Sequence, residues 1–284
     1  MKPEPKVKTW SQLTPEIAWH IFLNEGSRGF VRIAPPSMRI YKTIEKAVLK
    51  AIPTNPRCVA CAAPFSGAGA PLMRMMGRQR SSYNPSMCAD CENMAIKYHV
   101  QAEVPLTMIF ADIRGSTALA ERMDPAEFRR LINRFYQISA DILVNAKAMV
   151  DKFIGDEFSA YFVPGLVGKS HPRIAIEVAK EILKQTGHGA KAGPWVPVGV
   201  GIHSGPAIVG ALGIEGGLND ITVLGDTPNT ASRLASHAKA GEIIASEETV
   251  RQAGIATEDL AKGELRLKGK DQPVSVWHIS STRV

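Results

Sequence analysis

The chain has 284 residues, 45% of them hydrophobic and 21% charged, which is ordinary for a globular protein holding one good-sized domain and a smaller one. No window approaches about eighteen uninterrupted apolar residues, so the sequence predicts no membrane span. The opening stretch, MKPEPKVKTW, lacks an apolar segment followed by a small-residue cleavage site, and we therefore expect a cytoplasmic protein.

The net charge of +7 is unevenly distributed along the chain. Residues 105–284 carry 20 Lys and Arg and 20 Asp and Glu, so all of the basic excess precedes residue 105. A basic region can contact nucleic acid, anionic lipid or an acidic partner, but a solvated surface is the simpler interpretation. No basic strand studded with aromatic residues is present, and we expect no nucleic-acid partner.

Residues 1–56 are predicted to form a helical, basic N-terminal region. A short helix is expected over Pro15–Leu23, and an amphipathic one over Ser37–Ile52. The lysines of the second helix stand singly rather than in a cluster, which favours a packing helix over a membrane anchor.

Residues 57–91 contain all four cysteines of the chain, as two CxxC pairs. Cys58 and Cys61 form one pair, and Cys88 and Cys91 form the other. Two such pairs can supply a tetrahedral sulfur cage, which predicts one structural Zn2+ per chain. An iron–sulfur cluster and redox thiols remain alternatives, and disulfides are disfavoured by the absence of a secretion signal. The insert between the pairs is poor in helix or strand pattern, so metal would supply much of its stability.

Residues 92–104 are predicted to be a short helix and connector. This segment leads from the cysteine region into the first strand of the next domain. A regulator of unknown identity acting on the N-terminal region would therefore act through it.

The first strong strand signal is the apolar run Leu106–Ala111, which ends at Asp112 and a Gly115-Ser116-Thr117 corner. Asp112 is therefore expected at the open end of a buried strand. A carboxylate beside free backbone N–H groups can hold Mg2+ whose other ligands are phosphate oxygens. The alternative is that Asp112 merely caps a helix or forms a turn.

A long helix is predicted over Pro125–Ala148, with Asp124 as its cap. A hairpin follows over Met149–Val163, with Gly155 and Asp156 in its turn. If the hairpin tip lies beside the end of the Leu106 strand, Asp156 meets Asp112, and two such carboxylates can hold two cations for phosphoryl transfer. The alternative for Gly155-Asp156 is a simple turn.

The next elements are a helix from about His171 to Gln185 and a strand over Val196–His203. His203 is interpreted as a structural strand-end residue, because no Ser or Cys nucleophile motif accompanies it. Gly210–Asp220 is predicted to be a Gly-rich protruding loop, and Ile221–Leu224 a strand.

The sequence GDTP, residues 225–228, opens a further helix. On it Asn229 and Arg233 are four apart and share a face. An amide and a guanidinium so placed can hold a ribose and a charged phosphate. Two strands around a Lys-Gly-Lys turn end the chain.

From about residue 105 to 280, the sequence resembles the catalytic domain of the class III nucleotidyl cyclases, the adenylyl and guanylyl cyclase family. The resemblance is carried by FADIRGST, KFIGDEF and ITVLGDTPNTASRL, in the family's order and spacing. It implies an α/β (α+β) fold at residues 105–284, of ferredoxin-like βαββαβ order, with helices on a mainly antiparallel sheet.

The resemblance also assigns roles to individual residues. Two metal ions, Mg2+ or Mn2+, are expected at Asp112 and Asp156, with the carbonyl of Ile113 as a further ligand. Lys152 and Thr222 match the positions that contact the purine, where guanylyl cyclases typically carry Glu and Cys. The matches to the transition-state pair, the triphosphate-contacting lysine and the substrate corner are Asn229, Arg233, Lys268, Gly115, Ser116 and Thr117.

The activity implied is conversion of ATP to 3',5'-cyclic AMP and pyrophosphate by a homodimer with two composite active sites, regulated through the zinc region. The alternatives are a catalytically silent binding module and a cyclase for GTP or a pyrimidine nucleotide. Two departures from the family pattern are Pro228, where Val is usual, and a slightly longer Gly-rich loop over residues 213–220, the arm that contacts the partner in this family.

Overall fold

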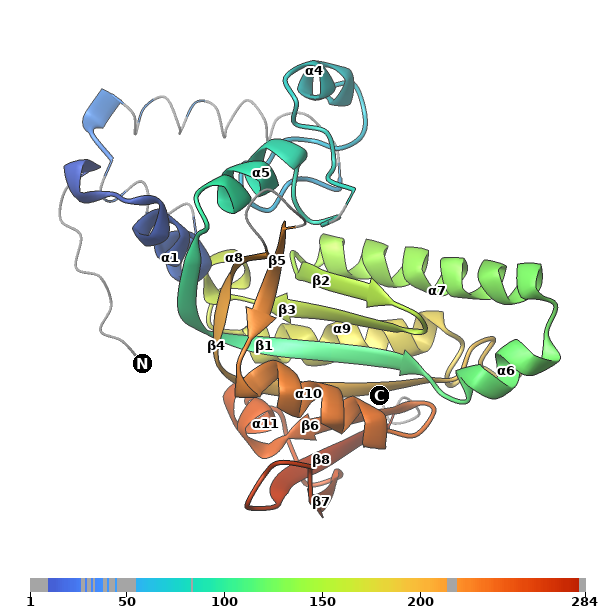
Figure 1. Cartoon of the computed structure of the whole chain (residues 1–284). Coiled ribbons are helices and arrows are strands. Elements are labelled where there is room, and N and C mark those ends of the chain that lie inside the picture. Colours follow the sequence, from blue (N-terminus) through green and yellow to red (C-terminus); the bar gives the residue numbers. More distant parts are fainter. Residues whose placement is uncertain are drawn as a thin grey trace.

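The computed structural model describes residues 10–26, 55–82, 84–213 and 219–280, together with positions 29, 32, 34–37, 40 and 44. An eight-stranded sheet in the order β2-β3-β1-β4-β6-β8-β7 forms its centre, and β5 pairs with β4 off this path (Figure 1). Only the β4–β6 pairing is parallel among the strand pairs of the described chain. The strands are β1 Gln101–Ile113, β2 Met149–Ile154, β3 Glu157–Phe162, β4 Val198–Gly213, β5 Asn219–Leu224, β6 Glu242–Ser246, β7 Ala261–Leu265 and β8 Val274–Ser280.

Helices cover both faces of this sheet. One face is covered by α7, α9 and α11, and the other by α1, α5 and α10. The helices are η1 Trp10–Gln12, α1 Pro15–Glu25, α4 Ala70–Met75, α5 Ala89–Lys97, α6 Ser116–Arg122, α7 Pro125–Asn145, α8 Pro164–Val167, α9 His171–Gln185, α10 Asp226–His237 and α11 Glu247–Ala253. No helix in the described ranges is long and apolar enough to cross a bilayer.

Strand β1 is buried on both faces, which explains its unbroken apolar run. Ile109, Ala111 and Ile113 point into the core beneath α7 and α9. Leu106 and Met108, of opposite parity, point into the second core, which includes residues of α1, α5 and α10. Since successive side chains alternate between faces, Asp112 lies on the same face as Met108.

The N-terminal helix α1 is part of this second core. The indole Nε1 of Trp19 donates a hydrogen bond to the carbonyl oxygen of Val209 on β4, at 2.9 Å. Phe22 and Leu23 are buried in the same cluster. The helix predicted over Pro15–Leu23 is therefore present and docks on the sheet, whereas most of the helix predicted over 37–52 lies outside the described residues.

Helix α10 lies directly on β4, at positions where the strand has no side chain. A Cβ built on Gly201 would lie 2.1 Å from the backbone nitrogen of Ala235, far inside van der Waals contact. Ala231, Leu234 and Ala235 form the buried side of the helix. Glycine at position 201 thus sets how closely α10 approaches the sheet.

Two predicted boundaries were wrong. Strand β1 begins at Gln101, so the last part of the predicted connector 92–104 is strand. Strand β4 continues to Gly213, so the loop predicted from Gly210 is a strand over its first residues and pairs with β5. A Cβ on Gly210 would lie 2.5 Å from the carbonyl oxygen of Val100, and the glycine thus serves close backbone packing rather than a loop.

Candidate active site and four-cysteine cluster

An acidic cluster forms where β1 ends beside the β2–β3 turn. Asp112 is the register partner of Glu157, and the backbone N–H of Ile113 donates to the carbonyl oxygen of Asp156 at 3.1 Å. The Asp156 carboxyl group is close enough to Asp112 to contribute to raising the pKa of Asp112. Gly155, with φ +63°, makes the turn that allows this approach. The predicted proximity of the two aspartates is therefore confirmed, and their role as metal ligands stays a prediction.

The alternative of Asp112 as a helix cap is wrong. Helix α6 has Gly115 as its N-cap, with no side chain capping it. The corner at residues 115–117 thus opens α6 directly after the acidic cluster.

The electrostatics of this cluster favour a cation. Burial raises the pKa of Asp112, opposed by the Arg114 guanidinium and reinforced by Asp156. Burial, with the nearby Asp112 and Asp156 carboxyl groups, raises the pKa of Glu157 to about 7. Carboxylates that resist ionising together are stabilised when a divalent ion neutralises them. Oxygen donors are the ligands that Mg2+ and Mn2+ prefer, so this donor set fits such ions.

Arg114 and Glu157 were not identified from the sequence. Arg114 forms an ion pair with Asp112, and its Nη1 donates to the carbonyl oxygen of Ser236 on α10 at 3.2 Å. Arg114 follows Asp112 by two residues and Glu157 directly follows Asp156, so the sequence placed both near the predicted aspartates. Only the register of β1 against β3 shows that all four residues form one cluster.

A second group lies where β2 meets β5. The Nζ of Lys152 is 3.8 Å from the Asp220 carboxylate, and the hydroxyl of Thr222 donates to Oδ1 of Asp151 at 2.9 Å. The two predicted base-contacting residues are thus brought into one neighbourhood. Asp151, which stands between them, was not predicted.

A third group involves α10 and the turn between β7 and β8. Asn229 is exposed and Arg233 half-buried on α10. The Arg233 guanidinium lies beside Gly269, next to the exposed Lys268, since a Cβ on Gly269 would be 3.5 Å from Nη2. The helix start is tied to the same turn by an ion pair of 2.5 Å between Asp226 and Lys270.

These groups do not meet within the described part of one chain. In the described ranges, no hydrogen bond or ion pair joins Asp112 or Asp156 to the predicted purine or transition-state residues. Among the described residues, the acidic cluster is joined to α10 by the hydrogen bond from Arg114 to the carbonyl oxygen of Ser236.

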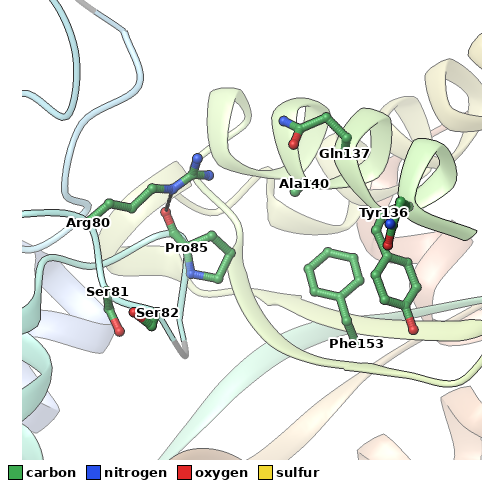
Figure 2. Close-up of a pocket in the computed structure, with 9 residues that line it drawn as sticks. Arg80, Ser81, Ser82, Pro85, Tyr136, Gln137, Ala140 and Phe153 are labelled. Carbon is green, nitrogen blue, oxygen red and sulfur yellow. Dashed lines mark hydrogen bonds between the residues drawn. The ribbon is translucent and has the colours of Figure 1, made fainter. Parts of the chain in front are cut away.

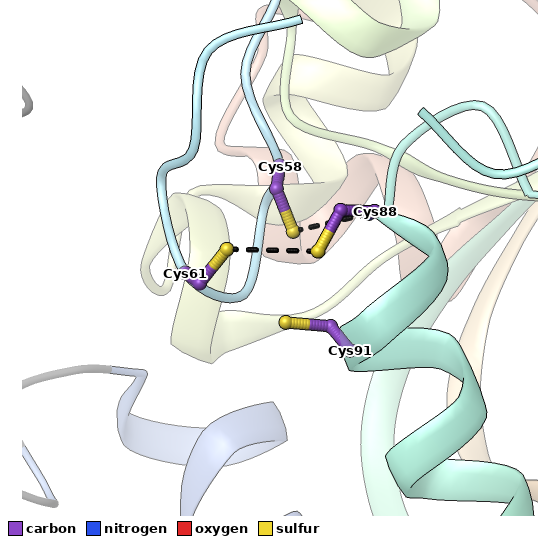
Figure 3. A group of neighbouring side chains, drawn as sticks. All are labelled: Cys58, Cys61, Cys88 and Cys91. Carbon is purple, nitrogen blue, oxygen red and sulfur yellow. Dashed lines mark hydrogen bonds between the residues drawn. The ribbon is translucent and has the colours of Figure 1, made fainter. Parts of the chain in front are cut away.

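The four cysteines converge as predicted (Figure 3). Their sulfur atoms all lie within 4.8 Å of one another, and the Sγ atoms of Cys61 and Cys88 are 3.7 Å apart. All four are free thiols, so the disulfide alternative is wrong. Hydrogen bonding to Cys58 and Cys61, with burial, raises the pKa of Cys88 and Cys91. A cation would reverse this, because metal binding requires thiolates.

A separate shallow pocket of about 440 Å³ lies between the cysteine region and α7 (Figure 2). Arg80 and Pro85 line it from one side, and Tyr136 and Phe153 from the other. It contains none of the predicted site residues, although the Tyr136 hydroxyl donates to the carbonyl oxygen of Gly155 in the hairpin turn.

Comparison with known proteins agrees with this fold and arrangement. Residues 98–280 match the model of the adenylate and guanylate cyclase catalytic domain. An adenylate cyclase of Anabaena cylindrica is 32% identical over 188 residues, covering 62% of this chain and 37% of that protein. The receptor-type guanylate cyclase gcy-6 of Caenorhabditis elegans is 30% identical over 180 residues, covering 61% of this chain and 16% of that protein.

Solved structures give the same result. The guanylyl cyclase Cya2 superposes with a TM-score of 0.56 at 25% identity, covering 62% of this chain and 92% of that one. The adenylyl cyclase CyaB from P. aeruginosa superposes with a TM-score of 0.55 at 26% identity, covering 63% and 94%. The chain belongs to the adenylate and guanylate cyclase catalytic domain family.

Proposed function

We propose that this protein is an adenylyl cyclase, which converts ATP to 3',5'-cyclic AMP and pyrophosphate. The observation that carries the proposal is the pairing of Asp112 with Asp156 at adjacent tips, together with the Lys152 and Thr222 neighbourhood. Its relatives include both adenylate and guanylate cyclases, so the choice of base rests on Lys152 and Thr222.

In the proposed reaction, the ribose 3'-oxygen attacks the α-phosphorus and pyrophosphate leaves, while the hydroxyl proton passes to solvent or substrate. Asp112, Asp156 and the carbonyl of Ile113 would hold two Mg2+ or Mn2+ ions, which supply charge neutralisation and activation of the hydroxyl. Asn229 and Arg233 would hold the ribose and the charged phosphate, and Lys268 the triphosphate. The corner at residues 115–117 offers backbone N–H groups at the start of α6 to the same phosphates.

The proposed assembly is a homodimer, in which each active site combines the acidic cluster of one protomer with the remaining groups of its partner. Within one described chain these groups stay apart, as a composite site requires. The exposed apolar face of the β4–β5 hairpin supports contact with a second copy of this chain. Ile208 and Leu224 are opposite each other in register and 43% and 44% exposed, and Leu212 on the same side is 52% exposed. Such an apolar face is typical of a contact surface.

We also propose one Zn2+ per chain at Cys58, Cys61, Cys88 and Cys91, with regulation through this region. Tetrahedral Zn–S bonds of about 2.3 Å place sulfur atoms about 3.8 Å apart. The separation of 3.7 Å between Cys61 and Cys88 fits one ion, whereas a polynuclear cluster would hold the sulfurs further apart.

The test is incubation of the purified protein with each of the four ribonucleotides and Mn2+, with products identified by mass spectrometry. Cyclic AMP from ATP in clear preference is the expected result. Preference for GTP or a pyrimidine nucleotide would overturn the base assignment. No product from any nucleotide, with binding retained, would support the silent-module alternative.

A further inference from the structure

Asp151 carries a partly buried carboxylate to which none of the predicted site roles is assigned. Strand β2 pairs Val150 with Ala160 and Lys152 with Ser159, so Asp151 is the extra residue of a β-bulge. Bulges re-aim side chains and are common beside active sites. Asp151 precedes Lys152 in the sequence, and at the bulge its carboxylate contacts Thr222 of strand β5.

Both oxygens of the Asp151 carboxylate accept a hydrogen bond. Oδ2 accepts from the Ser159 hydroxyl at 2.8 Å, and Oδ1 from the Thr222 hydroxyl at 2.9 Å. Three strands, β2, β3 and β5, are thereby joined through one side chain. Burial raises the pKa of Asp151, while these two hydroxyls and Lys152 oppose the shift.

We propose that Asp151 sets the preference for adenine, by fixing the Thr222 hydroxyl as a hydrogen-bond acceptor. The inference rests on the proposed function, in which Thr222 contacts the base. An ionised carboxylate only accepts hydrogen bonds, and a threonine hydroxyl has a single proton. Once that proton is donated to Asp151, only the lone pairs of Thr222 face a ligand.

The two purines differ in the group that such an oxygen meets. Adenine carries a 6-amino group, which donates, and guanine a 6-oxo group, which accepts. Thr222 held by Asp151 therefore attracts adenine and repels guanine. A threonine free to rotate would accept from one base or donate to the other, so discrimination needs the partner carboxylate.

The test compares kcat/KM for ATP and GTP at pH 8 in wild type and Asp151→Asn. The amide of the variant can donate to Thr222, which frees the hydroxyl to donate outward. We expect the ATP-to-GTP ratio to fall about tenfold or more, equivalent to one hydrogen bond of about 1.4 kcal/mol. A merely structural role would reduce turnover of both nucleotides and leave the ratio unchanged.

Ser159→Ala is the matched control, because it removes the other hydrogen bond to Asp151 and leaves Thr222 in place. Its ATP-to-GTP ratio should stay near the wild-type value. Equilibrium dialysis with labelled ATP and GTP gives the same comparison without turnover. If Asp151→Asn does not fold, Asp151→Ala, which removes the acceptor and leaves the Thr222 hydroxyl free to rotate, replaces it.

The two proposals fail differently. An ATP-preferring wild type whose Asp151 variant keeps the same ratio overturns this inference alone. A wild type that prefers GTP, or forms no cyclic nucleotide and binds both purines equally, overturns the proposed function and the inference that rests on it.

Discussion

The hydroxyl of Ser86 donates a hydrogen bond to the carbonyl oxygen of Ala148, at 2.7 Å. The same Oγ accepts from the backbone N–H of Val150 at 3.3 Å, and the carbonyl oxygen of Ser86 accepts from Val59 at 2.9 Å. Ser86 is 0% exposed. It therefore links both cysteine pairs to the start of the edge strand β2, which carries Asp151 and Lys152.

This link predicts that Ser86→Ala weakens nucleotide binding without removing metal. The change leaves the N–H of Val150 and the carbonyl of Ala148 without their partner in a buried place, which costs about 1–3 kcal/mol. We expect KM for ATP to rise about three- to tenfold by this disturbance of β2, with metal content unchanged. Ser66→Ala is the control, because the exposed Ser66 hydroxyl donates to the carbonyl oxygen of Asn55, outside β2. An unaltered KM in Ser86→Ala would contradict the coupling.

Cys88→Ser should remove zinc and lower activity indirectly. Cys88 is fully buried and is the N-cap residue of α5, so loss of the proposed metal bond would disturb the segment that enters β1. We expect about one zinc per wild-type chain by elemental analysis, and a weaker dimer by sedimentation in the variant. Iron, or no metal, in the wild type would remove the zinc assignment. A variant as dimeric and active as wild type would leave the cluster without a regulatory role.

Asp112→Ala and Asp156→Ala should each abolish cyclisation while leaving a folded dimer. The Asp156 carboxyl raises the pKa of Asp112, and both raise the pKa of Glu157, so removing either one relieves repulsion in the metal-free protein. We expect kcat to fall by at least about a hundredfold. Asp141→Asn, at an exposed position on α7, is the control and should keep its activity. Near wild-type turnover in either alanine variant would exclude the two-metal assignment.

Mixing the Asp112→Ala and Arg233→Ala proteins should restore part of the activity. If one site takes Asp112 from one protomer and Arg233 from the other, each heterodimer regains one intact site. An equal mixture should then recover about a quarter of wild-type activity, since about half of the dimers are mixed. Subunit exchange is verified by native mass spectrometry. Proven exchange without recovery would place the whole site within a single chain.

His171 predicts an acid-sensitive fold. Its Nδ1 is 2.7 Å from the Thr107 hydroxyl, and burial lowers the pKa of His171 to about 4, against about 6.5 in an unfolded chain. As the pH falls from about 6.5 to 4, the unfolded state takes up the proton first, and the free energy of unfolding decreases by up to about 3 kcal/mol. Above pH 6.5 the residue makes no pH-dependent contribution.

Urea denaturation at several pH values tests this. His171→Asn should lose stability less steeply than wild type between pH 6.5 and 4. His99→Asn, at an exposed left-handed position that asparagine tolerates, should follow the wild-type curve. Parallel curves for His171→Asn and wild type would show that this histidine is not neutral in the folded protein.

The parts predicted from the sequence are those whose signals are local. The apolar run before Asp112 and the Gly155-Asp156 turn each needed only neighbouring residues, and their proximity followed from strand and hairpin order. The predicted strand began at Leu106, after Pro105, because proline is usually confined to the ends or edges of strands. In the structure Pro105 and Pro206 are opposite each other at a non-hydrogen-bonded pair of the ladder, because the hydrogen-bonded pairs are those in step with Arg114–Pro197 and Val100–Ala211, so neither proline removes a hydrogen bond between β1 and β4.

Features that depend on tertiary register were not predictable in this way. Asp151 binds Thr222 only because of a bulge that no local pattern announces. Glu157 joins the acidic cluster through its pairing with Asp112. The outer part of β4 looked like a loop because its glycine reflects contact with Val100, which is distant in the sequence.

The contact of Gly201 with α10 bears on how sequence variants of this protein should be interpreted. Asn229 and Arg233 lie on α10, and the distance between this helix and the sheet depends on the absence of a side chain at Gly201 of β4. Gly201→Ala would keep every ligand and every charge, and it would score as a mild change by residue similarity. It would nevertheless force the backbone of Ala235 outward and carry both side chains with it. A substitution can thus impair catalysis at a position whose side chain carries no functional group.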